Sequence, residues 1–190
     1  MFQFWIIRSG ITEFDRQRRV MGNLDVPLHT DADQEIEAII SQMNDHPIEM
    51  VYTSPGQSSV ETAERLCRAW GVKYKPLDLL QNINLGLWQG LLLEEVKHKQ
   101  PKVFRQWQEH PETVCPPEGE MFQMARERID GFLAKAYRKH KTGVVAVVVP
   151  DPFATLLVSV LHQKKIKDIC QIRSDRDENI QIISPSLTNA

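Results

Sequence analysis

VVAVVVPDP, residues 144–152, is the stretch of sequence that decides the fold class of this chain. A continuous run of small and β-branched residues is typical of a strand buried on both faces of a parallel sheet. The apolar span 143–161 resembles a membrane helix in length, but Asp151 and two prolines at its centre would be costly in a bilayer. We therefore expect a strand, a turn and then a helix that begins near Phe153.

Further strands and helices alternate along the chain. Phe2–Arg8 is aromatic and β-branched and ends at Ser9-Gly10, which indicates a buried strand running into a turn. The same signals predict further strands at 50–53, 72–77, 168–173 and 179–184. Apolar residues at helical spacing, with a cap at Thr30 and breaks at Gly71 and Pro101, predict helices near 30–43, 60–70, 91–99, 103–109, 122–136 and 153–162.

This alternation predicts an α/β fold. We expect a three-layer α/β/α sandwich around a mainly parallel mixed sheet, with room for an antiparallel strand at its end. The 190 residues suit a single domain spanning 1–190 and are enough for a sizeable core. Within it, segment 91–117 is expected to be a lid or an insertion, and 185–190 a loose tail.

Composition excludes several classes of protein. Lys and Arg number 23 against 25 Asp and Glu, for a formal net charge of −2, which argues against a nucleic-acid binder. We also expect no membrane association, since no segment reads as a signal core or a spanning helix. Three scattered cysteines, Cys67, Cys115 and Cys170, lack metal spacing and fit a reducing cytoplasm.

The strand ends are where a ligand site is expected. In open α/β sheets, ligands bind beyond the carboxyl ends of the strands. Three such ends carry polar or turn-forming residues: Arg8-Ser9-Gly10, the segment 53–58, and Pro150-Asp151-Pro152. The sequence alone therefore predicts a site built from these three places.

Motifs at these strand ends have the order and spacing of a known family. They are RSGITEFD at 8–15, GNLDVPLH at 22–29, YTSPGQSSVETA at 52–63, LQNINLGLWQG at 80–90, PEGEM at 117–121 and VPDP at 149–152. Together they resemble the histidine phosphatase superfamily, the phosphoglycerate-mutase-like fold. The resemblance implies a site in which one histidine attacks a phosphoryl group, two arginines and a second histidine hold its oxygens, and a carboxylic acid protonates the leaving group.

This chain departs from that pattern at almost every catalytic position. By the resemblance, Arg8 is the one catalytic residue that remains. Its companions are all replaced: the nucleophilic histidine by Ser9, the phosphate-binding asparagine by Asp15, the second arginine by Ser58, the general acid by Asn82 and the second histidine by Asp151. These six residues form the expected remnant of a phosphate pocket, with no catalytic set intact.

Structural roles for the same residues are open alternatives. Arg8 can form an ion pair with Asp15 or Asp151, and the two serines can simply fill a collapsed pocket. Asp151 can cap the helix that follows it. The two aspartates together could hold a hard cation, although two carboxylates are few for that role. A haloacid-dehalogenase-like aspartyl phosphate at Asp151 and a Ser9/Asp151 hydrolase are both disfavoured, because each lacks an essential partner.

The sequence therefore favours a pseudoenzyme, a pseudophosphatase that serves as a binding or regulatory module. Its partner would be a small anion or a protein, it would need no cofactor or metal, and a homodimer stays open. The competing hypothesis is a weak or altered phosphomonoesterase or a phosphoglycerate-mutase-like enzyme. A purely structural subunit is the third.

Overall fold

The computed structural model describes residues 2–43, 46–164 and 179–183 of the chain. Its strands form one twisted sheet in the order β3-β2-β4-β1-β5. Strands β1 to β4 are parallel, and β5 runs antiparallel to β1 at the edge. Their bounds are Phe2–Arg8 for β1, Ile48–Thr53 for β2, Tyr74–Pro76 for β3, Gly143–Val149 for β4 and Ile180–Ile183 for β5.

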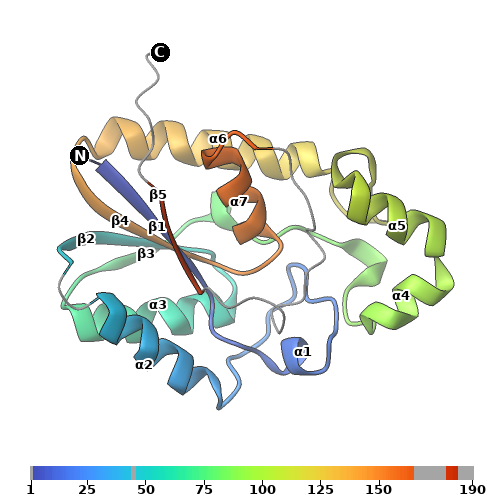
Figure 1. Cartoon of the computed structure of the whole chain (residues 1–190), viewed down its shortest axis with the longest axis horizontal. Helices are drawn as coiled ribbons and strands as arrows, with labels where there is room; N and C mark the ends of the chain where they lie inside the picture. Colours follow the sequence, from blue (N-terminus) through green and yellow to red (C-terminus); the bar gives the residue numbers. More distant parts are fainter. Residues whose placement is uncertain (1, 44–45, 165–178, 184–190) are drawn as a thin grey trace.

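Helices cover both faces of this sheet, as Figure 1 shows. Helices α2 and α3 lie on one face, and α6 and α7 lie on the other. Short helices α1, α4 and α5 extend from the end of the sheet at which β1 finishes. The helices are α1 Glu13–Arg16, α2 Ala32–Met43, α3 Gln57–Trp70, α4 Leu93–Lys99, α5 Pro101–Glu109, α6 Phe122–Lys139 and α7 Phe153–Leu161, and the 3-10 turns are η1 Asp78–Leu80, η2 Gly86–Trp88 and η3 Pro111–Thr113. The expected α/β sandwich is therefore confirmed.

Strand alternation divides the core into two layers. Because successive side chains of a strand point to opposite faces, neighbouring residues of β1 enter different clusters. Phe4 and Ile6 pack with α6 and α7, whereas Trp5 and Ile7 pack with α2 and α3. The continuous apolar run of β4 is explained in the same way, since all residues from Val144 to Val149 are buried.

Several elements start or end away from their predicted bounds. Strand β3 is shorter than the expected 72–77, and the chain between it and the helix expected near 91–99 forms η1 and η2. Helix α5 begins at Pro101 itself, because the first helical position needs no backbone N–H. The strand expected at 168–173 and the tail 185–190 lie outside the described residues.

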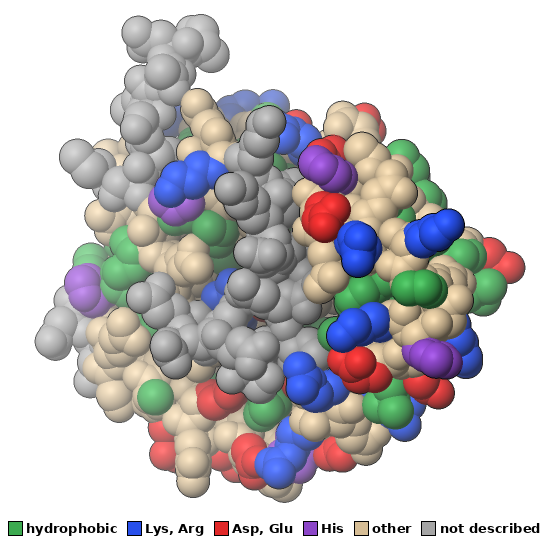
Figure 2. Space-filling view, turned by 45° about the vertical axis from the view of Figure 1, so that its right-hand side comes forward, with side chains coloured by type: hydrophobic (Ala, Val, Ile, Leu, Met, Phe, Trp, Pro, Cys, Tyr) green, Lys and Arg blue, Asp and Glu red, His purple; other side chains and the backbone are tan. Residues whose placement is uncertain are grey.

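Segment 91–117 shares the main core. Val96, Phe104 and Trp107 are buried in the cluster that also holds α6 and α7. Trp107 meets Trp88 edge to face, with 5.4 Å between ring centroids. Figure 2 brings this side of the molecule forward and shows Lys and Arg side chains interspersed with Asp and Glu. The near-zero net charge is thus matched by a mixed surface on this face.

Candidate functional site

Parallel pairing of β1 with β4 brings the first two site residues together. The register places Arg8 beside Val149, so Asp151, two residues further on, lies next to the arginine. Arg8 Nε donates to Asp151 Oδ2 over 2.7 Å, and the two side chains are only 7% and 19% exposed. The sequence left two partners open for Arg8, and in the structure the ion pair is formed with Asp151 and not with Asp15.

The second oxygen of Asp151 caps the helix that follows. Asp151 Oδ1 accepts hydrogen bonds from Thr155 Oγ1 at 2.7 Å and from Thr155 N at 3.2 Å, in the first turn of α7. A carboxylate is favourable at this end of a helix. Asp151 therefore divides its two oxygens between a buried arginine and a helix start. Thr155 was not among the predicted site residues, although an Asp followed four residues later by Thr at a helix start is the signal that could have found it.

Asn82 connects three segments at the same place. Its side-chain amide Nδ2 donates to Gly22 O at 2.6 Å and to Asp151 O at 2.9 Å, and its Oδ1 accepts from Phe153 N at 3.3 Å. The side chain is almost fully buried. Both functions of the amide are used, one to donate and one to accept. A carboxylate here would set a negative charge against two carbonyl oxygens, so this surrounding suits an amide.

Ser9 and Ser58 are small buried side chains, one directly after β1 and one in the first turn of α3. Ser9 N donates to Val149 O at 3.1 Å, which continues the β1–β4 ladder past Arg8. Ser58 lies in the first turn of α3, and its carbonyl accepts from Thr62 Oγ1 at 2.7 Å. That hydroxyl in turn accepts from Gly10 N at 2.8 Å. Thr62, which is not among the predicted site residues, therefore ties α3 to the end of β1.

Asp15 stands apart from the others in its contacts. Its Oδ2 accepts from Thr12 N at 2.7 Å and from Thr12 Oγ1 at 2.6 Å, and its own N donates back to that hydroxyl, a capping box at the start of α1. Within the described residues, no group of three or more His, Cys, Asp and Glu could hold a metal ion. The two aspartates thus serve separate local structures.

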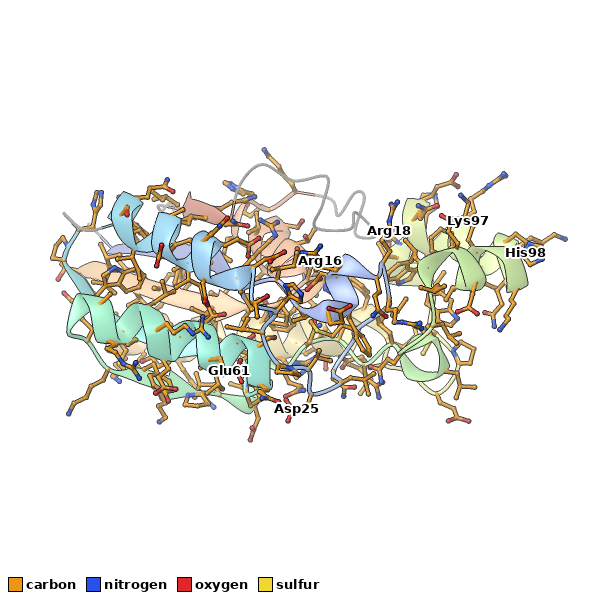
Figure 3. The ribbon with its side chains drawn as sticks, turned by 90° about the horizontal axis from the view of Figure 1, so that it is seen from below. Arg16, Arg18, Asp25, Glu61, Lys97 and His98 are labelled. Atoms are coloured by element: carbon orange, nitrogen blue, oxygen red, sulfur yellow. The ribbon has the colours of Figure 1, made fainter. Side chains whose placement is uncertain are left out.

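Acidic groups also face the first turn of α3. Asp25 Oδ1 accepts from Gln57 N at 2.7 Å, and Glu61 accepts from Gln57 Nε2 at 2.8 Å and from Leu28 N at 3.0 Å. Figure 3 shows Asp25 and Glu61 together at this helix start, while Arg16, Arg18, Lys97 and His98 lie toward α1 and α4. A helix N-terminus normally favours an anion, and here the protein supplies the negative charge itself.

Fold and site together define an α/β protein whose polar residues meet at the carboxyl ends of parallel strands. Comparison with known proteins makes the class specific. The model of the histidine phosphatase superfamily (branch 1) matches residues 4–183. The chain therefore belongs to the histidine phosphatase superfamily.

Two of the curated relatives that match carry phosphatase names. Phosphoserine phosphatase 1 of Hydrogenobacter thermophilus is 28% identical over 148 residues, which cover 78% of this chain and 70% of that protein. A probable 2-carboxy-D-arabinitol-1-phosphatase of Arabidopsis thaliana is 30% identical over 151 residues, 75% of this chain. The match spans only 30% of that plant protein, and 45% of a bifunctional protein of Mycobacterium tuberculosis.

Solved structures confirm the fold. Bacillus stearothermophilus YhfR superposes with a TM-score of 0.85 at 21% identity, covering 97% of this chain and 91% of that one. A mycobacterial glucosyl-3-phosphoglycerate phosphatase reaches 0.80 at 20% identity, covering 88% and 85%. In the described part of the chain, no helix is both long enough and apolar enough to span a membrane.

Proposed function

We propose that this chain is a histidine-phosphatase-fold protein that has lost phosphoryl transfer and acts as a binding or regulatory module. The observation that carries the proposal is the buried pair of Arg8 and Asp151. By the family resemblance, Arg8 is the residue that would hold a phosphoryl oxygen, and here its charge is balanced by a carboxylate of the protein.

The charge of the site opposes a phosphate dianion. Two like unit charges about 4 Å apart repel by roughly 4 kcal/mol at an effective dielectric near 20. A phosphoryl group held by Arg8 would lie near the carboxylate of Asp151. Electrostatic stabilisation of the transferring group, usually the largest catalytic contribution, is therefore largely cancelled.

The nucleophile and the acid are missing as well. A serine hydroxyl such as that of Ser9 is a weak nucleophile unless a base activates it. His29, in the neighbouring segment, instead contacts Glu13 at 3.4 Å and accepts from Asp31 N at 3.1 Å. Asn82 cannot release a proton to a leaving group, and its amide hydrogens are already directed at Gly22 O and Asp151 O. Burial raises the pKa of the Cys67 thiol to about 12, which removes it as a thiolate nucleophile.

A weak phosphomonoesterase is the second candidate, because the relatives are named as phosphatases. Losing one clamp would leave a slow enzyme, but nucleophile, acid and clamp act as one unit, and their joint loss removes nearly all of the rate.

We also assign the chain to the cytoplasm on its scattered cysteines, of which Cys67 and Cys115 are free thiols.

Turnover of two phosphate esters tests the proposal. The purified chain is assayed with p-nitrophenyl phosphate and with phosphoserine, with and without Mg²⁺, beside phosphoserine phosphatase 1 of Hydrogenobacter thermophilus as the positive control on phosphoserine. We expect a rate equal to the buffer blank for both the wild type and Ser9→Ala. A metal-independent rate above the blank that Ser9→Ala abolishes would establish the enzyme instead.

A further inference from the structure

Four of the exposed apolar side chains lie on segments that contact one another. Among residues 2–43, 46–164 and 179–183, the large hydrophobic side chains that are exposed are Leu24, Leu87, Val103, Met121, Met124 and Ile182. Leu87 and Met124 are 58% and 54% exposed. Single exposed hydrophobic residues need no explanation, but a group of them marks an interaction surface.

Backbone contacts bring Leu87 to the start of α6. Leu87 N donates to Pro117 O, and Glu120 N donates to Asn84 O, both at 2.9 Å. The two segments approach so closely at Gly86 and Gly119 that a Cβ on Gly86 would lie 2.0 Å from Pro117 O. Met121 is the residue just before α6, Met124 lies in its first turn, and both side chains are exposed.

Leu24 is tied to the same segment through one glutamine. Gln89 Oε1 accepts from Asn23 N at 2.9 Å and from Leu85 N at 3.2 Å. The loop that carries Leu24 is therefore held beside the segment that carries Leu87. We call Leu24, Leu87, Met121 and Met124 the apolar rim.

Met121 is placed at a position where an apolar residue is unfavourable for folding. It is the N-cap of α6, and no side chain caps that helix start. Ser, Thr, Asp or Asn at an N-cap stabilises a helix by about 1 kcal/mol relative to an apolar residue. Methionine there gives up that stability and adds an exposed, flexible thioether, which suits an adaptable contact surface.

Exposed acidic residues adjoin the rim residues in the sequence, and the basic side chain of Arg19 reaches the same segment at Gly90 O. Asp25 follows Leu24 directly, Glu118 is exposed in the turn before α6, and Glu127 is exposed one turn after Met124. Arg128 on the same side is neutralised by Glu120, whose Oε1 lies 2.7 Å from Arg128 Nη2. Arg126, two residues after Met124, lies about 200° around the helix from it and so on another face.

We propose that the apolar rim is the docking surface for a basic amphipathic helix of a partner protein. Apolar side chains of such a helix would cover the rim, and its Lys and Arg would face Asp25, Glu118 and Glu127. A second copy of this chain is the poorer occupant, because a two-fold contact through the rim would set these carboxylates against one another.

The apolar rim would be the place at which the proposed binding function is carried out. The docking inference rests on that proposed function only for its biological purpose. The probe is a fluorescently labelled helical peptide of Leu and Lys in amphipathic order, with a Leu/Glu peptide of the same pattern and a Ser/Lys peptide of equal charge as comparisons. Fluorescence anisotropy gives the affinity of each for the full chain.

We expect the Leu/Lys peptide to bind at least tenfold more tightly than either comparison peptide. Leu87→Ser combined with Met124→Ser should weaken it about tenfold or more, since hot-spot residues dominate such contacts. Glu118→Gln with Glu127→Gln should weaken it and reduce its salt dependence. The matched control is Val103→Ser with Ile182→Ser, which removes exposed apolar side chains elsewhere and should leave the affinity unchanged.

Three results would overturn the docking proposal: no measurable binding of the Leu/Lys peptide, equal binding of the Leu/Glu peptide, or equal loss in the control variant. Circular dichroism of each variant checks whether the fold is intact. Ester turnover is measured on the same samples. Measured turnover would refute the proposed loss of catalysis and would not affect the peptide result. A failed peptide assay would refute the docking proposal and would not affect the turnover result.

Discussion

Asn82 shows at the scale of single residues how one side chain holds several segments of the site together. By the resemblance its position belongs to a general acid, yet its amide joins Gly22, Asp151 and Phe153 in one buried cluster. A buried polar group that loses its partner costs about 1–3 kcal/mol. The amide is therefore a structural requirement here, rather than a neutral relic.

Asn82→Asp tests this role with almost no change in shape. The carboxylate would place negative charge against two carbonyl oxygens, so we expect the free energy of unfolding to fall by about 2–3 kcal/mol at neutral pH. Urea denaturation measures it. Asn23→Asp, at an exposed position of the neighbouring loop, is the control and should change stability by under about 0.5 kcal/mol. Equal effects of the two substitutions would remove Asn82 from its structural role.

At the scale of elements, replacing two glycines by alanine is expected to change stability in opposite directions. Gly86 has φ +53° and lies against the backbone of Pro117 and Gly119, so Gly86→Ala should destabilise the fold by about 2 kcal/mol or more and loosen the loop that carries Asn82. Gly131 lies inside α6, and a Cβ there would meet nothing closer than 4.0 Å. Gly131→Ala should therefore stabilise the chain by about 0.5–1 kcal/mol.

Thermal unfolding followed by circular dichroism measures both glycine variants. The melting temperature should fall for Gly86→Ala and rise for Gly131→Ala. A rise for Gly86→Ala would show that segments 84–87 and 117–120 are not packed as closely as described.

His140 at the end of α6 gives the fold a pH dependence. Lys139 Nζ donates to Tyr52 Oη at 3.2 Å, and the same Tyr52 hydroxyl shares a hydrogen bond with His140 Nε2, 2.9 Å away. The pKa of His140 is lowered from its ordinary value of 6.5, first by burial and then by Lys139, against a smaller opposite effect of Glu49. The neutral ring is therefore the folded form.

Stability should fall as the pH is lowered below about 6.5. The unfolded chain then binds a proton at His140 that the folded chain still excludes, so the contribution is complete above 6.5 and is lost as the pH falls toward the folded pKa. Urea midpoints between pH 5 and pH 8 measure it. His140→Gln should flatten the profile, and His98→Gln, at an exposed position of α4, should not. Identical profiles for all three chains would exclude His140 as the cause.

At the scale of the whole molecule, strand and helix periodicity was sufficient to predict the layered sheet. The run 144–149 and the strand Phe2–Arg8 lie side by side in register, which is why residues at their ends meet. Sequence reasoning left two partners open for Arg8, because the register that favours Asp151 is a property of the assembled sheet. Thr155, Thr62 and the amide contacts of Asn82 depend on three-dimensional neighbours in the same way, and the sequence offered only a weak signal for them.

The most direct test of the account is whether Arg8 can bind a phosphate ion. Isothermal titration calorimetry with inorganic phosphate compares the wild type, Asp151→Asn, Arg8→Gln, and Asp151→Asn combined with Arg8→Gln. Asp151→Asn keeps the shape of the side chain and removes the charge that balances Arg8. We predict no measurable binding by the wild type, at least tenfold tighter binding by Asp151→Asn, and loss again in the double variant. Wild-type binding that is as tight as that of Asp151→Asn, and that Arg8→Gln alone abolishes, would contradict the claim that the ion pair closes the site.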